Sequence, residues 1–343
     1  MKQQPLSART LKIAWPLLLL AAATVFPLVA DPAMGNVAVL TLLYAAAAVS
    51  WNIFSGYTGY ISLGHATFFG FGAYTMAIIS VNQHLPGGFG LFLLVPVAGV
   101  VAALVAIPIG WILLRTRGHA FVIITLITVF IFQLLATNLR GLTEGSAGIF
   151  LPFTGFDPDW FLLPFYYIEL GVLVLAVLVS WYIRNSKYGL GLLAIRDDED
   201  RAEGLGVRTG GSKLIALIIS AFFMGMVGAI HAYFLGAVYP QQVFDPALTI
   251  IIVLMAFLGG LGTLSGPILG AVVLEVAQQY FGLNSQIGYY QIVLGALFLI
   301  VMLLLPQGIV RSLARLWNAW RVRSGAGGSP VAPERQPAVV EKG

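Results

Sequence analysis

Residues 185–213, which read NSKYGLGLLAIRDDEDRAEGLGVRTGGSK, form a charged segment in a chain that is otherwise almost uncharged. Together with Arg184, this segment holds six Lys or Arg and five Asp or Glu residues. Over all 343 residues, charged residues make up only 9% and apolar residues 59%, whereas an average soluble domain is about 25% charged. A soluble protein cannot cover so much apolar surface. The composition therefore predicts one integral membrane domain, with residues 185–213 as a loop in water.

The apolar runs on both sides of this loop are long enough to cross a bilayer. A spanning helix needs about 20 apolar residues, and ten runs approach that length. We therefore expect an all-α integral membrane protein with about ten transmembrane helices, some of them interrupted by glycine. The expected spans are residues 11–30, 36–54, 63–81, 91–114, 119–138, 165–183, 213–237, 247–264, 266–281 and 289–305.

The charges between the spans predict their orientation. The N-terminus carries Lys2, Arg9 and, at the start of the first span, Lys12, which places it in the cytoplasm by the positive-inside rule. Ten alternating spans then place residues 184–212 and the C-terminus in the cytoplasm as well. The expected outer loops contain a single basic residue, Arg140. We expect the first apolar run to be a retained helix, because it is longer than the core of a typical signal peptide.

The last residues differ in composition from the spans and divide the chain into three expected parts. Residues 1–310 form the transmembrane domain. Residues 311–324 place leucine and tryptophan at helical spacing beside arginines, which predicts a basic amphipathic helix on the inner leaflet. An ordinary helix end with snorkelling arginines is the alternative. Residues 325–343 are rich in Gly, Pro and Ala and are expected to be a disordered cytoplasmic tail.

Residues 56–75, GYTGYISLGHATFFGFGAYT, combine five glycines with polar side chains at membrane depth. Backbone that is not helical is tolerated there only inside protein or along a water-filled cavity. Discontinuous helices often mark transport sites, because their ends can face a solute. This stretch is therefore a candidate solute pathway, with the candidate residues Ser62, Gly64, His65, Gly70 and Tyr74.

A second glycine pattern lies in residues 259–275, GGLGTLSGPILGAVVLE. Gly262, Gly266 and Gly270 form two G-x-x-x-G steps in tandem. Small residues four positions apart let helix backbones approach closely in lipid, which predicts helix packing. The alternative is a tight turn or broken helix beside a pathway.

Four ionisable residues lie inside expected spans: His65, Glu169, His231 and Glu275. Such residues are costly in a membrane, and each is a candidate for function. Glu169 can instead reach water near the outer end of its span, and His231 can be neutral and hydrogen-bonded. Glu275 shares a helical face with Gln278 and Gln279. The sequence leaves their roles open.

Several kinds of chemistry have no candidate residues in the sequence. The chain has no cysteine, which excludes disulfides and thiol nucleophiles. It has no phosphate-binding loop, H-E-x-x-H pattern or nucleophile elbow. The net charge of +4 is typical of the positive-inside bias rather than of nucleic-acid binding. We therefore expect no metal, no cofactor and no catalytic activity.

The charged loop itself has the pattern of a helix followed by a turn. Residues from Leu192 to Ala202 favour a helix, and Gly204 and Gly206 can end it. A short helix beneath the membrane can be held by another protein, whereas the alternative is a plain solvated loop.

The motifs of this chain resemble a known family. NSKYGLGLLAIRDDEDRAEGLGV resembles the cytoplasmic coupling loop of ABC importer permeases, and in particular of the branched-chain amino acid (LivM-type) permease family. GYTGYISLGHATFFGFGAY, GGLGTLSGPILGA and LPQGI resemble further blocks of that family in the same order. One departure is GLTEGSAGI, where Glu144 stands near a position that is usually Gly-Gly. The residues that match in the loop are Asn185, Ser186, Gly189, Ala194, Ile195, Arg196, Asp198, Glu199, Ala202 and Gly206.

The resemblance implies a non-catalytic permease subunit of an ATP-driven importer in a bacterial inner membrane, with residues 1–310 as the permease domain. Its implied partners are a second permease, two cytoplasmic ATPases and a periplasmic solute-binding protein. The ATPases would dock on residues 184–212. The implied coupling residues are Gly189, Ala194, Arg196, Asp198, Glu199, Ala202, Glu203 and Gly206.

Three alternatives remain at this point. Related permeases with the same blocks import urea or short amides. A stand-alone secondary transporter or channel would belong to another class, and the lack of buried acidic pairs speaks against it. A membrane enzyme has no candidate active site.

Overall fold

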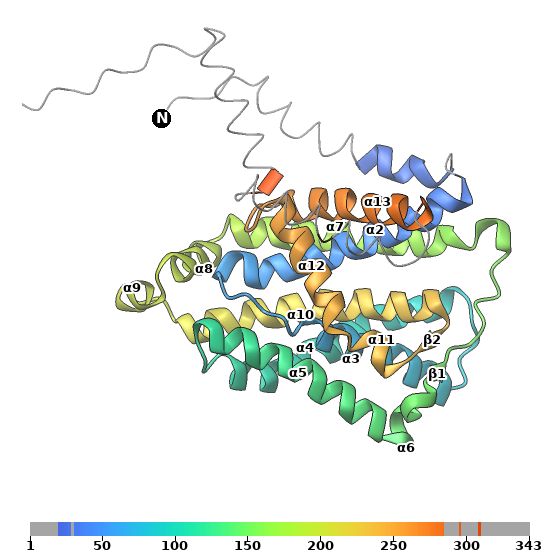
Figure 1. Ribbon diagram of the computed structural model, residues 1–343, viewed down its shortest axis with the longest axis horizontal. Coiled ribbons are helices and arrows are strands. Elements are labelled where there is room, and N and C mark those ends of the chain that lie inside the picture. The colour runs from blue at the N-terminus through green and yellow to red at the C-terminus, as the bar shows by residue number, and fades with distance from the viewer. Residues whose placement is uncertain (1–19, 29–30, 285–294, 296–307, 310–343) are drawn as a thin grey trace, which may run out of the picture.

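The computed structural model describes residues 20–28, 31–284, 295 and 308–309, and this part of the chain is mostly helical (Figure 1). The protein is a multi-pass, all-α membrane protein. Residues 311–324 and 325–343 and most of the expected first and tenth spans lie outside the described residues. Within the described residues, six helices are long and apolar enough to cross a membrane: Met34–Gly56, Phe89–Leu113, Gly118–Asn138, Pro158–Arg184, Thr209–Leu235 and Pro240–Gly259.

The elements follow the expected spans closely. Residues 20–28 are helical. The helices that follow are α2 (Pro32–Trp51), α3 (His65–Asn82), α4 (Leu94–Leu113), α5 (Gly118–Asn138), α6 (Arg140–Thr143), α7 (Leu162–Arg184), α8 (Lys187–Asp197), α9 (Glu199–Gly204), α10 (Thr209–Leu235), α11 (Pro240–Val243), α12 (Pro246–Gly259) and α13 (Gly266–Asn284). The shorter elements are the π-helical turn η1 (Asn52–Gly56), the 3-10 turns η2 (Phe89–Leu93), η3 (Gly145–Ala147) and η4 (Pro158–Trp160), and the strands β1 (Ile149–Phe150) and β2 (Ala237–Val238).

Helix α10 lies at the centre of the bundle. It contacts α2 and α7 on one side and α3 and α4 on the other, so the bundle has two layers with α10 between them (Figure 1). Helices α12 and α13 pack against α2 in the first layer. Helices α8 and α9 project from one end of the bundle, whereas the antiparallel pair of β1 and β2 lies at the opposite end.

Glycines allow the central helices to touch. A Cβ atom at Gly72 of α3 would lie 1.9 Å from the carbonyl oxygen of Gly225 of α10, and one at Gly228 would lie 2.1 Å from that of Phe69. The backbones of α3 and α10 are therefore in direct contact. The sequence predicts that Gly64, Gly70 and Gly72 interrupt the third span. Gly64 directly precedes α3, but the interruption at Gly70 and Gly72 is wrong, because α3 is continuous from His65 to Asn82. Glycine serves here for close packing.

The eighth span is shorter than its apolar run predicts. The sequence predicts a span over 247–264, but α12 ends at Gly259. Gly260 and Gly262 adopt positive φ angles of 126° and 71°, which end the helix and reverse the chain toward α13. The fourteen residues of α12 span about 21 Å, and only together with α11 does the segment Pro240–Gly259 reach a length that can cross a membrane.

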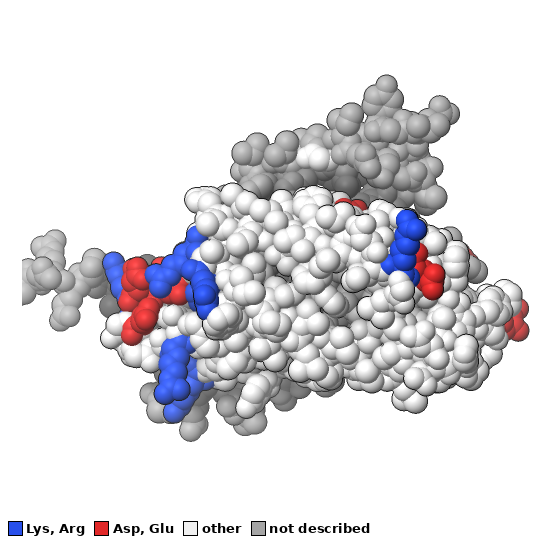
Figure 2. Space-filling model, turned by 90° about the horizontal axis from the view of Figure 1, so that it is seen from below, with Lys and Arg blue, Asp and Glu red and all other residues white. Residues whose placement is uncertain are grey.

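Charge gathers at the two ends of the molecule (Figure 2). The flank between them is apolar and carries large exposed side chains, including Leu104, Ile107, Ile127, Phe130 and Leu134. Such a continuous apolar flank is typical of a surface that faces lipid.

Candidate functional site

The charged end of the bundle begins where α7 turns into α8. Ser186 is the N-cap of α8, and its hydroxyl accepts a hydrogen bond of 3.1 Å from the Gly189 amide. A Cβ atom at Gly189 would lie 2.0 Å from the Ile183 carbonyl oxygen, so only glycine fits this corner. The sequence N-S-x-x-G therefore fixes the direction in which α8 leaves the end of α7.

The charged loop contains two helices rather than one. The sequence favours a single helix from Leu192 to Ala202, but α8 ends at Asp197 and α9 begins at Glu199. Asp198 lies between them with extended backbone (ψ 109°), and its carboxylate accepts from the Arg201 amide. Asp198 is therefore an N-cap, and the single-helix prediction is wrong at this residue.

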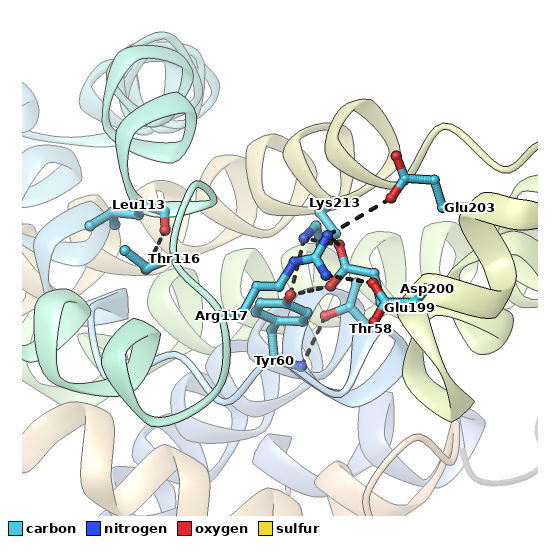
Figure 3. Close-up of polar contacts among 9 residues, drawn as sticks. All are labelled: Thr58, Tyr60, Leu113, Thr116, Arg117, Glu199, Asp200, Glu203 and Lys213. Carbon is cyan, nitrogen blue, oxygen red and sulfur yellow. Dashed lines mark hydrogen bonds and ion pairs between the residues drawn. The ribbon is translucent and has the colours of Figure 1, made fainter.

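Glu199 is held by the side chains of Lys213 and Tyr60 (Figure 3). The Lys213 Nζ atom, at the start of α10, donates to Glu199 Oε1 at 2.5 Å and to the Tyr60 hydroxyl at 3.2 Å. The Tyr60 hydroxyl donates to Glu199 Oε2. The Lys213 side chain is only 2% exposed and that of Glu199 11%. These three residues, termed the coupling cluster below, join α9, α10 and the segment between α2 and α3.

The surroundings of Glu199 stabilise its charged form. Burial by itself raises the pKa of this carboxyl, but the hydrogen bonds from Lys213 and Tyr60 and the charges of Lys213 and Arg117 outweigh it, so the pKa lies below its ordinary value. Burial and the bond to Glu199 raise the pKa of the Tyr60 hydroxyl. The cluster is therefore a carboxylate held by an ammonium and a neutral phenol at neutral pH.

Arg117 adds an exposed layer of ion pairs over the coupling cluster. It lies between α4 and α5, and its guanidinium lies 2.6 Å from Asp200 and 3.8 Å from both Glu199 and Glu203. Its side chain is 54% exposed, and Figure 3 shows it reaching across to α9. Helix α9 is thereby connected to three different parts of the membrane domain.

Arg196 makes a second connection, deeper in the bundle. Its Nη1 donates to the Gly56 carbonyl at 2.8 Å, and a Cβ atom at Gly262 would lie 2.2 Å from the same nitrogen. Asn52 lies on the other side of this turn, where its side chain accepts from the Gly262 amide at 2.8 Å and donates to the Thr263 carbonyl at 3.0 Å. The loop, η1 and the turn between α12 and α13 meet here.

The other expected coupling residues differ in burial and in what they do for the loop. Gly189 and Ala202 are buried and shape the loop, whereas Glu203 is exposed. Gly206 has a φ of 89°, which ends α9, and Ala194 is half-buried in α8. Leu205, directly after α9, is an apolar side chain that is 85% exposed.

The sequence did not identify Tyr60, Lys213 or Arg117 as site residues. They come from three separate segments, so no spacing connects them. One sequence feature could have drawn notice to Lys213, which is a lysine directly before a long apolar run.

The candidate pathway residues do not form one group. Ser62 and His65 lie at the start of α3, where the His65 ring contacts Ser62 Oγ at 3.1 Å and Ser220 Oγ at 2.8 Å. Ser50 and Ser220 exchange hydrogen bonds with each other's carbonyl oxygens. His65 is fully buried in this serine cluster, and Gly64 allows the approach of the Thr125 carbonyl at a Cβ distance of 2.9 Å.

Gly70 and Tyr74 lie farther along α3, next to Phe244. The rings of Tyr74 and Phe244 are stacked at 5.8 Å, and a Cβ atom at Gly70 would lie 2.3 Å from the Phe244 ring. A role for either group of residues in a solute pathway stays a prediction.

The glycines expected to pack helices also lie in two settings. Gly266 and Gly270 belong to α13, and a Cβ atom at Gly270 would lie 1.8 Å from the Met255 carbonyl oxygen of α12. Gly262 lies in the turn before α13, so the tandem step does not lie on one helix.

The buried ionisable residues outside the site have few partners. Both carboxylate oxygens of Glu169 and the Nδ1 atom of His231 have no hydrogen-bond partner among the described residues. Glu275 Oε1 accepts from Gln279 at 3.2 Å. Within the described residues, no group of three or more His, Cys, Asp or Glu side chains could hold a metal ion.

Residues 33–302 match the family model described as branched-chain amino acid transport system / permease component. The chain is 29% identical to the high-affinity branched-chain amino acid transport system permease protein LivM of Escherichia coli K12, over 85% of this chain and 73% of that protein. It is 25% identical to LivH of Salmonella typhimurium, over 81% and 94% respectively. It is 23% identical to the ribose import permease protein RbsC of Haemophilus influenzae, over 68% and 72%. No solved structure matches the chain significantly.

Proposed function

The chain belongs to the branched-chain amino acid transport system permease family, and we propose that it is the membrane subunit of an ATP-driven importer for branched-chain or related amino acids. The family model covers most of the chain, and both LivM and LivH are named as permeases for branched-chain amino acids. We propose ten spans with both termini in the cytoplasm of a bacterial inner membrane.

The same relatives support the first of the proposed partners, a second permease, and the resemblance of the charged loop to a coupling loop implies the others. The chain matches two differently named permeases, LivM and LivH, which supports a second permease beside this one. Two cytoplasmic ATPases and a periplasmic solute-binding protein complete the assembly. The sequence has no phosphate-binding loop, so the ATPases supply all hydrolysis and this subunit is not catalytic.

The coupling cluster is the observation that carries the proposed mechanism. Glu199 belongs to α9, and its ion pair with the buried Lys213 ties α9 to the first turn of α10. Helix α10 contacts both layers of the bundle. A displacement of α9 by an ATPase is therefore transmitted to α10, and the layers can move between outward-open and inward-open arrangements.

Leu205 offers a direct test of docking on this loop. Its side chain is 85% exposed, so a change to aspartate leaves the packing of the chain intact. We expect Leu205→Asp to release the ATPases from the purified complex and to abolish solute-stimulated ATP hydrolysis. Retention of both would contradict docking on this loop.

Phe153 is a matched control at the opposite end of the bundle, because it is an equally exposed apolar residue, also 85% exposed. Phe153→Asp is expected to leave ATPase binding unchanged. Uptake by this chain alone in liposomes would contradict the importer role itself. Uptake of urea but not leucine by the complete assembly would change the substrate class and keep the permease role.

A further inference from the structure

Asn52 lies at the end of α2, where the helix widens into the π-helical turn η1. Turns of this kind are frequent at functional sites. The side chain is buried, and both ends of its amide bind the same neighbour: Oδ1 accepts from the Gly262 amide at 2.8 Å, and Nδ2 donates to the Thr263 carbonyl at 3.0 Å. This pair of bonds needs an acceptor and a donor side by side, which an amide carries. Asn52 therefore fixes the turn between α12 and α13 to the end of α2.

The charged loop holds η1 from its other side. In a continuing helix the Gly56 carbonyl would bond the amide four residues later, but the Tyr60 amide donates to the Thr58 hydroxyl instead. The Gly56 carbonyl is thereby left for Arg196 of α8, whose Nη1 donates to it at 2.8 Å. Gly59 has a φ of 77°, and a Cβ atom there would lie 3.4 Å from the Arg196 Cα atom. Helix α8 therefore rests directly on the end of η1.

Little space separates α8, η1 and the turn between α12 and α13. A Cβ atom at Gly56 would lie 1.9 Å from Asn52 Oδ1 and 3.2 Å from the Gly262 amide nitrogen. One at Gly262 would lie 2.2 Å from Arg196 Nη1. Two glycines thus allow the amide and the guanidinium to reach the same turn. Groups packed this closely transmit a displacement to one another, so the three parts are expected to move together.

The opposite side of the loop faces open space. A pocket of about 430 Å³ lies between the loop, residues 58–61 and the start of α5. Arg117 reaches across to Asp200 (Figure 3), but both side chains are largely exposed, and exposed ion pairs contribute little. The loop therefore has room to move relative to α5, whereas it is tightly packed on η1.

We propose that Asn52 is a positioning residue of the coupling step: together with Arg196, it makes the turn between α12 and α13 follow the charged loop when the ATPases displace the loop. The inference rests on the proposed function. It adds a second route to that of the coupling cluster, which leads to α10, and it identifies α12 and α13 as the helices at the end of this second route.

Distances between spin labels test whether these parts move together, in the complete assembly with cysteine-free partner subunits. This chain has no cysteine, so pairs of introduced cysteines carry the labels. Asp197 of α8, Ser265 of the turn and His119 of α5 are all exposed. On binding of a non-hydrolysable ATP analogue, the 197–119 distance is expected to change by about 2–5 Å, the range of helix shifts in such transitions. The 197–265 distance is expected to stay constant.

Two results of this measurement would overturn the proposal. Equal changes in both distances would mean that the turn stays with the rest of the bundle and does not follow the loop. Constancy of both distances would mean that the loop does not move over the pocket.

Asn52→Leu gives a second measurement, in liposomes. It keeps a buried side chain of similar size and removes both bonds to the turn. Glu199, Lys213 and Tyr60 keep their contacts, so solute-stimulated ATP turnover is expected to continue. Uptake per ATP hydrolysed is expected to fall by about tenfold, the factor that corresponds to the loss of two hydrogen bonds. A merely structural Asn52 would lower uptake and ATP turnover in the same proportion.

Ser80→Ala is the matched control for the loss of a buried hydrogen bond. Ser80 is fully buried, and its hydroxyl donates within α3, to the Ala77 carbonyl. Because this bond does not join two elements, uptake per ATP should stay at the wild-type value. A fall equal to that of Asn52→Leu would overturn the proposal.

Arg196→Met shows whether Asn52 and Arg196 act in series. It removes the bond to the Gly56 carbonyl and should by itself lower uptake per ATP. If both residues serve one connection, the double variant is no worse than the poorer single variant, whereas independent effects multiply. Multiplying effects would overturn the proposal, as would unchanged uptake per ATP in Asn52→Leu. A wild-type assembly without ATP-driven uptake of branched-chain amino acids would instead overturn the proposed function.

Discussion

Helix α10 is held in two different ways along its length. At its start, Lys213 forms a charged contact with Glu199 and Tyr60. Near its middle, Gly225 and Gly228 bring its backbone against those of α3 and α4. The first contact depends on three side chains that can separate and meet again, whereas the second depends on the absence of side chains. The contact at the start of α10 can therefore break and re-form, whereas the contact near its middle fixes α10 against α3 and α4.

The glycine contact should be the more sensitive of the two. Gly72→Leu places a side chain where the Gly225 carbonyl oxygen lies, with a Cβ distance of 1.9 Å. Backbone cannot repack as a side chain can, so we expect a loss of more than about 3 kcal/mol, above the usual range for overpacking. Size-exclusion chromatography of the purified chain should show aggregation.

Gly171 of α7 is the control for this prediction, because nothing lies within 4 Å of a Cβ atom placed there. Gly171→Leu should leave the chain monodisperse. A well-folded Gly72→Leu protein would show that α3 and α10 can separate.

The chain should be more stable without both Glu199 and Lys213 than without Glu199 alone. Glu199→Ala leaves the ammonium of Lys213 buried and unpaired, which costs about 3 kcal/mol, the lower end for a buried pair. Lys213→Met in the same chain removes the buried charge and should recover most of the loss. Denaturant unfolding in detergent would measure both effects.

The matched control is Glu203→Ala, because the Glu203 side chain is 62% exposed. It should have little effect on stability. If the double variant is no more stable than Glu199→Ala, the ion pair is not what holds α9.

The Tyr60 hydroxyl contributes two hydrogen bonds to the same contact, as donor to Glu199 and as acceptor from Lys213. Tyr60→Phe keeps the ring beneath Lys213 and removes both of them. We expect a loss of about 2 kcal/mol, within the range for hydrogen bonds to charged groups. A thermal melt of the complex would measure it, and no change would mean that Lys213 alone suffices.

Arg117 should have a smaller effect that depends on salt, because its side chain is 54% exposed and exposed ion pairs are screened. Arg117→Gln should slow solute-stimulated ATP turnover at low ionic strength and match the wild type at high ionic strength. Arg115, two residues earlier, stacks on Trp111 at 3.7 Å, so Arg115→Gln is the control. A deficit that persists at high salt would indicate a direct contact with the ATPase.

The smallest expected effect is that of pH. A lowered folded-state pKa means that Glu199 stabilises the loop fully above its ordinary pKa of about 4.3 and loses this contribution as the pH falls below that value. Coupled ATP turnover should therefore show no Glu199-dependent change between about pH 8 and pH 5.5. A midpoint near pH 6 that disappears in Glu199→Gln would contradict the described cluster.

The sequence predicted the helices better than the contacts between them. The expected span 119–138 matches α5 (Gly118–Asn138) to within one residue. The length of an apolar run and the polar residues at its ends can be read from local composition. Asp198 separates α8 from α9 because its side chain caps α9. Composition does not predict whether an aspartate at this position caps a new helix or continues the old one. Lys213 and Tyr60 are 153 positions apart in the chain, so their contact depends on how the helices pack.

Helix α12 connects two places that are far apart in the chain. One end, at Gly259, adjoins the turn that Asn52 holds next to Arg196. The other end, at Pro246, follows Phe244, which lines an apolar pocket together with Phe71 and Phe132. A helix of fourteen residues is a rod about 21 Å long. If it pivots at the Asn52 turn, a tilt of roughly 10° carries the far end through about 4 Å, the width of one aliphatic side chain. A small rotation of α12 at its Gly259 end is thus enough to open or close, at its Pro246 end, a space the size of an aliphatic side chain.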